Sequence, residues 1–208
     1  MSMTRRALLG AALGLAVVLA ATVVARVVAD RRPALPVYWA APSFELVDQA
    51  GDTVRTADLR GSAWLASFVF TNCLDVCPAI SAQMARAATR LRSDGLLGTR
   101  ARLVSFTVDP ERDTPGVLRD YAARFGARPP AEWAFLTGIP GDSMRAMIQQ
   151  GFRLSAMMPD APDPMYQVMH SPRVLLVDPA GDVRGVYDAT DPAAVDSALT
   201  DLRALVDD

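Results

Sequence analysis

The two cysteines of the chain, Cys73 and Cys77, are its most constraining feature. They are the only thiols in 208 residues and lie four positions apart. An apolar run, residues 64–70, precedes them, and Pro78 follows Cys77 directly. Continuous apolar runs of this length are typical of strands buried on both faces of a sheet, and proline favours the first turn of a helix. The pair therefore lies at a predicted strand-to-helix junction.

The pattern around this junction predicts an α/β domain. Strands and helices alternate, and the last two strands flank a hairpin signal. A redox-type cysteine pair at the first strand-to-helix junction favours a thioredoxin-like sheet. The expected strands are 44–48 and 53–55, an N-terminal β-hairpin extension, and then 64–70, 102–108, 133–136, 173–177 and 183–187. The expected helices are 78–97, 115–125 capped by Asp113 or Thr114, one capped by Asp142 or Ser143 and ending near Gln150, and 193–206.

The first thirty residues differ from the rest of the chain. Residues 7–25 carry no charge and as a helix would cover about 28 Å, close to the hydrocarbon core of a bilayer. We expect an uncleaved N-terminal transmembrane helix within 1–30, with a cleaved signal or a twin-arginine signal as alternatives. A linker over 31–40 and one domain over 41–208 follow. The sequence thus favours a bacterial inner-membrane protein with its domain in the periplasm, where disulfides form.

The net charge of the chain and the spacing of the two cysteines limit which functions this domain can have. The formal net charge of −2 provides no basic face, which argues against a nucleic-acid partner. A structural disulfide between Cys73 and Cys77 would close a loop of only about 5 residues and contribute about 2 kcal/mol, against about 4.7 kcal/mol for a loop of 100. Inert core thiols are a second interpretation. A reversible disulfide or a pair of metal ligands suits the spacing better, and a position beside the helix start predicts a stabilised thiolate at Cys77.

His170, the only histidine, is the natural third ligand. A solitary histidine is usually a surface residue or a satisfied buried one. However, His170 lies beside a methionine-rich segment and precedes the predicted strand 173–177, whose end can approach the cysteine loop in a thioredoxin-like sheet. Two thiolates and an imidazole suit copper, because a structural zinc site normally takes four ligands. Loop packing is the simpler role for the nearby thioethers of Met157, Met158, Met165 and Met169.

Several segments in order resemble the Sco/SenC family. The central one is the CxxxCP motif at 70–78, and the others are 42–51, 59–61, 108–115 and 170–181. The resemblance covers roughly residues 40–205. It implies a membrane-anchored thioredoxin-like copper chaperone for cytochrome c oxidase. It also implies that Cys73, Cys77 and His170 bind copper and that the cysteines form a reversible disulfide.

Two residues depart from the family pattern, and one further carboxylate has an open role. Leu74 stands where proline is common in the family, and Met169 stands where an aspartate often precedes the histidine. The second change removes a negative charge beside His170 and puts the balance of copper delivery and thiol chemistry in question. Asp109 follows a buried strand and precedes a proline, so it is either a functional carboxylate or a turn residue.

Two functions therefore compete. The first is a copper metallochaperone that passes one Cu(I) or Cu(II) ion to the copper-bearing subunit of a respiratory oxidase, with other periplasmic copper carriers as partners. The alternative is a membrane-anchored thiol-disulfide reductase that uses Cys73 and Cys77, although the usual oxidoreductase spacing is CxxC. A peroxiredoxin fits less well, because neither cysteine has a threonine three residues before it.

Overall fold

The structure is a computed structural model that describes residues 20, 34–73, 76–129, 131–154, 156–157, 169–170 and 172–207. The chain divides into two compact units, Met1–Leu35 and Pro36–Asp208. Apart from Ala20, the expected transmembrane helix within 1–30 lies outside the described residues. Within the described ranges, no helix has both the length and the apolar character needed to cross a membrane.

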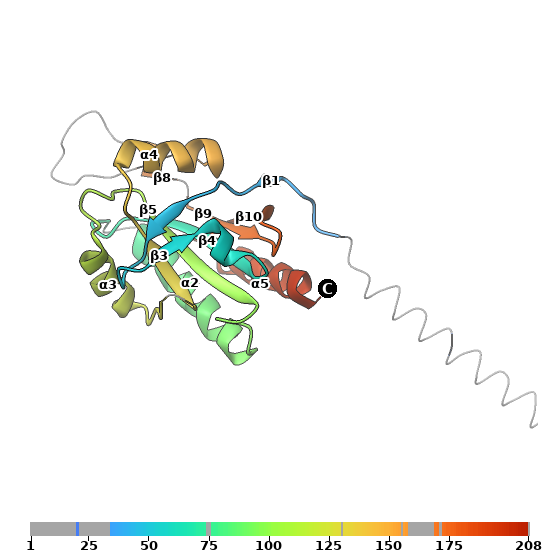
Figure 1. Ribbon diagram of the computed structural model, residues 1–208. Coiled ribbons are helices and arrows are strands. Elements are labelled where there is room, and N and C mark those ends of the chain that lie inside the picture. Colours follow the sequence, from blue (N-terminus) through green and yellow to red (C-terminus); the bar gives the residue numbers. More distant parts are fainter. Residues whose placement is uncertain are drawn as a thin grey trace, which may run out of the picture. The chain divides into compact units, whose positions relative to one another are not determined.

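The second unit contains a six-stranded sheet with the order β1-β10-β9-β4-β5-β6 (Figure 1). The strands β4 (Ala63–Val69), β5 (Ala101–Thr107) and β6 (Trp133–Leu136) are parallel. The antiparallel edge consists of β9 (Arg173–Val177), β10 (Asp182–Asp188) and β1 (Trp39–Ala40). Every residue of β4 is buried, as its unbroken apolar sequence predicts for a central strand. The predicted α/β order with an antiparallel edge is confirmed.

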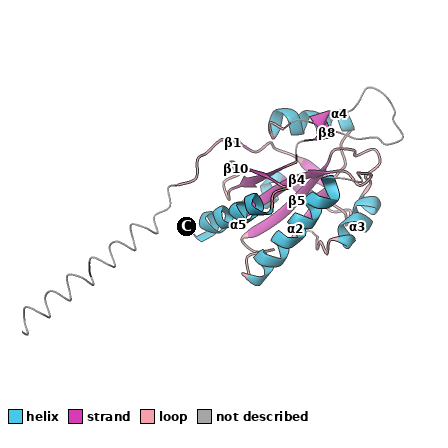
Figure 2. Cartoon of the chain, turned by 180° about the vertical axis from the view of Figure 1, so that it is seen from behind, coloured by secondary structure: helices cyan, strands magenta, loops and turns pink. Residues whose placement is uncertain are grey.

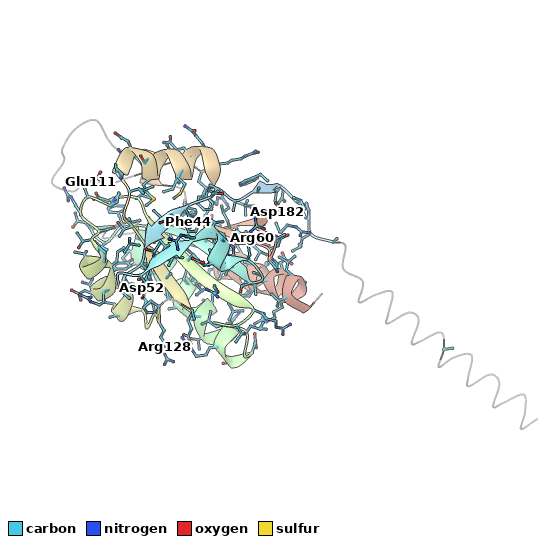
Figure 3. The ribbon with its side chains drawn as sticks, in the orientation of Figure 1. Phe44, Asp52, Arg60, Glu111, Arg128 and Asp182 are labelled. Atoms are coloured by element: carbon cyan, nitrogen blue, oxygen red, sulfur yellow. The ribbon has the colours of Figure 1, made fainter. Side chains whose placement is uncertain are left out.

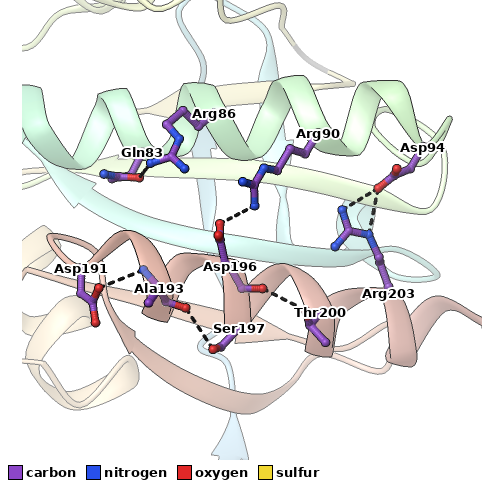
Figure 4. Close-up of polar contacts among 10 residues, drawn as sticks. All are labelled: Gln83, Arg86, Arg90, Asp94, Asp191, Ala193, Asp196, Ser197, Thr200 and Arg203. Atoms are coloured by element: carbon purple, nitrogen blue, oxygen red, sulfur yellow. Dashed lines mark hydrogen bonds and ion pairs between the residues drawn. The ribbon is translucent and has the colours of Figure 1, made fainter. Parts of the chain in front are cut away.

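Three helices cover one face of this sheet, and Figure 2 shows them in front of the strands. They are α2 (Val76–Ser93), α3 (Pro115–Arg124) and α5 (Pro192–Asp207). Two ion pairs, Arg90–Asp196 and Arg203–Asp94, link the α2 region to α5 (Figure 4). The predicted helix over 78–97 exists, but α2 begins two residues earlier and ends at Ser93. Its buried side includes the predicted apolar stripe of Ile80, Met84, Ala87, Ala88 and Leu91.

The opposite face carries the predicted hairpin and an aromatic cluster. The hairpin strands β2 (Glu45–Val47) and β3 (Thr53–Arg55) pair antiparallel, and the 3₁₀ turn η1 (Thr56–Leu59) follows them. The segment formed by α4 (Gly141–Ala146) and the π-helical turn η2 (Met147–Gly151) leads to Phe152. Phe44, labelled in Figure 3, contacts Phe106 edge to face at 5.1 Å between ring centroids, and Phe152 lies 4.9 Å from the same ring. The cluster comprises Phe44, Trp64, Phe68, Phe106 and Phe152.

Of the two predicted helix caps, the one at α3 is correct and the one at α4 is wrong. Thr114 caps α3, as one of the two predictions had it. The prediction that Asp142 or Ser143 caps the next helix is wrong, because α4 begins at Gly141 and Pro140 is its N-cap. The Gly141 amide donates instead to Glu111 Oε1 at 2.8 Å, so a carboxylate from another loop satisfies this helix start.

Short strands form at the end of the expected linker and in the region before β9. Trp39–Ala40, at the end of the expected linker, pair with β10 as β1. Before β9, β7 (Ala156–Met157) pairs antiparallel with β8 (Met169–His170) in a separate two-stranded sheet. All of the intervening residues, 158–168, lie outside the described ranges.

Candidate metal centre

The cysteines lie at the carboxyl ends of the central parallel strands. After β4 the chain turns, and the Cys73 amide donates to the Phe70 carbonyl at 3.3 Å. Helix α2 then starts at Val76, so Cys77 is its second residue and Pro78 its third. The predicted strand-to-helix junction is therefore confirmed. In open α/β sheets this edge is where ligands bind.

Both sulfurs are buried, and they are not joined in a disulfide. Cys73 is 9% exposed and Cys77 is fully buried. The Cys77 amide donates to Cys73 Sγ at 3.4 Å. This amide belongs to the first turn of α2, whose N–H groups have no partner within the helix. Cys73 is thus the sulfur that faces the helix N-terminus, a role that the sequence had assigned to Cys77.

Burial makes Cys77 a protonated thiol rather than a stabilised thiolate. Desolvation raises the pKa of Cys77 well above its ordinary value of 9.0; a backbone hydrogen bond with Phe70 partly opposes this shift, and Cys73 and Asp113 add to it. The predicted thiolate at Cys77 is therefore wrong for the protein as described. The physical reason is that a buried site penalises charge more strongly than the helix start favours it. A soft metal ion that binds here has to displace this proton.

Asp113 connects the cysteine turn to the neighbouring strand. Its side chain is buried and accepts hydrogen bonds from both the amide and the hydroxyl of Thr71, the hydroxyl at 2.5 Å. Its Oδ2 accepts from the Thr107 hydroxyl at 2.5 Å. Burial raises the pKa of Asp113, while the threonine hydrogen bonds oppose that shift. The sequence offered Asp113 only as a helix cap, so its contact with the cysteine turn was missed.

Asp109 opens the same loop and has the predicted turn role. Its carbonyl accepts from the Arg112 and Asp113 amides, as a turn residue does. Its buried carboxylate approaches Arg112 Nε at 3.6 Å, and Oδ2 has no hydrogen-bond partner among the described residues. Burial and the nearby charge of Asp113 raise the pKa of Asp109, although Arg112 opposes this shift. The turn role is present, Oδ2 is contacted by the Arg112 ion pair alone among the described residues, and a functional role for this carboxylate stays a prediction.

Tyr121 and Ser81 form a polar contact near the cysteines. Ser81 lies one turn after Cys77 on α2, and its hydroxyl is 2.9 Å from the Tyr121 hydroxyl of α3. Burial raises the pKa of Tyr121 to about 12, and the hydrogen bond with Ser81 partly opposes this shift. The sequence gave no signal for this contact, because the two residues lie 40 positions apart.

The third predicted ligand is described only through its backbone. His170 pairs with Ala156, and Met169 pairs with Met157. The side chains of all four residues, and the whole of Met158 and Met165, lie outside the described part of the structure. Among the residues that could be searched, no three His, Cys, Asp or Glu side chains form a metal-binding group. Convergence of His170 on Cys73 and Cys77 therefore stays a prediction.

Known proteins share both the sequence and the fold. The chain is 30% identical over 169 residues to the SCO1 protein homolog of Bacillus subtilis, which covers 81% of this chain and 84% of that protein. It superposes with a TM-score of 0.71 and 30% identity on BsSco, a member of the Sco family of cytochrome c oxidase assembly proteins in which a disulfide switch was identified. That match covers 82% of this chain and 95% of the other.

A copper-bound structure also matches. Yeast Sco1 with copper bound gives a TM-score of 0.64 at 26% identity, over 80% of this chain and 90% of that one. The predicted thioredoxin-like α/β fold with an added β-hairpin is thereby confirmed. Residues 37–207 match the family model described as SCO1/SenC. Since this match spans most of the chain, the protein belongs to the SCO1/SenC family.

Proposed function

We propose that this chain is a copper metallochaperone. Cys73, Cys77 and His170 bind one copper ion and deliver it to the copper-bearing subunit of a respiratory oxidase. The observation that carries the proposal is the pair of unbridged sulfurs at one helix start, with the Cys77 amide directed at Cys73 Sγ. Copper is the protein's cargo in this function.

The donor set fits a soft, exchangeable ion. Two thiols and one imidazole match the preferences of Cu(I), and Cu(II) takes a further ligand. Cys73 is slightly exposed while Cys77 is buried, so the ion enters and leaves on the Cys73 side. Deprotonation of Cys77 on binding makes the affinity pH-dependent.

Relatives support the cargo and the recipient. Yeast Sco1 was crystallised with copper bound, and BsSco belongs to a family of cytochrome c oxidase assembly proteins. We infer the same cargo and the same class of recipient for this chain, with other periplasmic copper carriers as donors. From the uncharged run of residues 7–25 we further infer that residues 1–30 anchor the domain to the bacterial inner membrane and that the domain faces the periplasm.

A copper titration tests this function. The purified full-length protein is titrated under reducing conditions and compared with Cys73→Ser, Cys77→Ser and His170→Ala. We expect one copper per chain with cysteine-to-copper charge-transfer absorption in the wild type, and loss of tight binding in each cysteine variant. His170→Ala is expected to weaken binding. Unchanged copper binding by His170→Ala would remove the histidine from the ligand set.

The second candidate function is thiol-disulfide reduction. Its supporting observation is that the two cysteines are unbridged and placed for exchange, and that BsSco contains a disulfide switch. In this reaction one thiolate attacks a partner disulfide and the other cysteine resolves the mixed disulfide, so two electrons pass to the partner. Fast reduction of an oxidase subunit's disulfide by the copper-free protein, unaffected by His170→Ala, would favour this function over delivery.

A further inference from the structure

Asp113 joins three segments of the chain at the candidate site. It is 1% exposed, and its carboxylate receives hydrogen bonds from Thr71 and from Thr107. Thr71 lies between β4 and Cys73, and Thr107 is the last residue of β5. Thr71 is 42 positions from Asp113 in sequence, so this contact exists only in the folded domain.

The directions of these hydrogen bonds require an acceptor at Asp113 Oδ2. The Asp109 amide donates to Thr107 Oγ1 at 3.0 Å, which leaves the Thr107 proton for Asp113 Oδ2. The Thr71 amide cannot act as an acceptor, and it lies 3.1 Å from Oδ2 and 3.3 Å from Oδ1. An asparagine at this position would remove the negative charge, and its NH₂ group would face the Thr71 amide at the Oδ1 position, or that amide and the Thr107 hydroxyl at the Oδ2 position. The contacts therefore select a carboxylate rather than any polar side chain of the same size.

Thr71, which Asp113 anchors, belongs to the turn that carries Cys73. That turn is closed by the Cys73 amide, which donates to the Phe70 carbonyl. It places Cys73 Sγ at the Cys77 amide. Fixing Thr71 therefore fixes the orientation of the turn relative to the start of α2. Cys77 needs no such anchor, because it is already a residue of the helix.

We propose that Asp113 is a positioning residue for Cys73, which holds the sulfur close to Cys77 so that the pair is preorganised for closing on a metal ion or on each other. This inference rests on the proposed function, in which the two sulfurs act together. Preorganisation raises the effective concentration of one thiol at the other. Loss of the anchor lowers it, even where the fold persists.

The glutathione equilibrium of the copper-free, full-length protein tests the proposal. Two protein thiols and one glutathione disulfide give the protein disulfide and two glutathione thiols, so the protein loses two electrons and its two protons end on glutathione. We expect Asp113→Asn to reduce this equilibrium constant about tenfold, the scale of one lost hydrogen bond to a charged group. Thr71→Val is expected to act in the same direction and less than additively with Asp113→Asn, because both remove the same contact.

A matched control separates positioning from general destabilisation. Ser105→Ala, on β5, removes buried hydrogen bonds to Ser67 of β4 and Trp133 of β6, away from the cysteine turn. It should lower the melting temperature and leave the glutathione equilibrium unchanged. Thr107→Val should lower the equilibrium constant, as Asp113→Asn does. Thr107→Ser keeps the hydroxyl and should therefore keep the wild-type value.

The outcomes separate this proposal from the proposed function. A wild-type equilibrium constant in Asp113→Asn, or an equal shift in Ser105→Ala, overturns the positioning role. If Asp113→Asn does not fold, Thr71→Val and the Thr107 pair decide in the same way. A wild-type protein that binds no copper, with the shift in Asp113→Asn intact, overturns copper delivery and leaves Asp113 positioning a redox pair.

Discussion

The turns that begin at Asp48 and Asp178 share one design, and the turn from Asp109 to Asp113 has another. The first two have the sequence Asp-x-Ala-Gly-Asp, and their last residues, Asp52 and Asp182, are labelled in Figure 3. In each, the first aspartate's Oδ1 accepts from the amides two and four residues later, at 2.8–3.0 Å. In the third turn, threonine side chains from β5 and the cysteine turn hold the carboxylate of Asp113.

This difference separates a scaffold turn from a site. A carboxylate that backbone amides hold within five residues stabilises its own hairpin and needs no distant partner. A carboxylate that accepts hydrogen bonds from side chains of two other segments also fixes the positions of those segments. The predictions below test whether the hairpin turns affect stability alone while the third turn affects the cysteines.

The largest expected effect is on stability at Asp178. Its Oδ2 accepts from Arg184 at 2.6 Å, and both side chains are largely buried. Asp178→Ala removes this ion pair and the two amide contacts of the turn, so we expect a loss of about 3 kcal/mol in the free energy of unfolding, measured by urea denaturation.

Asp48→Ala is the matched variant for this prediction. Asp48 makes the same amide contacts, but its Oδ2 has no hydrogen-bond partner among the described residues. Its loss should therefore be clearly smaller than that of Asp178→Ala. Both variants should bind copper with wild-type affinity. Weakened copper binding in either one would contradict the assignment of these turns to the scaffold.

The glycines of the two hairpin turns come next in size. Gly51 and Gly181 have φ values of 96° and 93°, and an added Cβ at either position would meet no atom within 4 Å. The cost of alanine there is therefore one of backbone conformation alone, about 1–2 kcal/mol. Differential scanning calorimetry of Gly51→Ala and Gly181→Ala should give nearly equal losses. Gly116→Ala, in the first turn of α3, is the control and should be neutral or stabilising.

Local sequence was enough to predict the scaffold but only part of the site. The hairpins, the buried strand β4 and the cysteine junction follow from apolar runs, turn residues and Pro78, which act over a few positions. The contacts of Asp113 join residues 42 positions apart and leave no local pattern. The exchange of roles between Cys73 and Cys77 was also missed, because it depends on how deeply α2 packs against the sheet.

The buried Cys77 thiol should make the folded protein less stable at alkaline pH, an effect that the hairpin turns do not share. Its raised pKa means that the folded protein disfavours the thiolate. The stability from this group is therefore complete below its ordinary pKa of 9.0 and is lost as the pH rises above that value towards the folded pKa. We expect the wild type to lose about 1 kcal/mol between pH 9 and pH 10 relative to Cys77→Ala, measured by urea denaturation with a phosphine reductant.

Tyr121 sets the upper limit of the useful pH range. Its pKa is raised from 10.0 to about 12, so it adds its own loss of stability above pH 10 in both proteins. The comparison is therefore made below that pH. Parallel pH profiles of the wild type and Cys77→Ala between pH 9 and pH 10 would contradict the buried, protonated thiol.

The smallest expected effect is a gain in stability at Asp109. Burial raises the pKa of Asp109, so the fold disfavours the ionised carboxylate. The contribution of this group to stability is therefore complete below its ordinary pKa of 3.8. It is lost as the pH rises through the pKa of the folded protein. Asp109→Asn avoids this cost and should be more stable than the wild type at pH 7 by about 1 kcal/mol or less. The gain should vanish near pH 3, and Asp120→Asn, on the exposed side of α3, controls for loss of one charge. A loss of stability at pH 7 would show that the Asp109 carboxylate is satisfied, as in the hairpin turns.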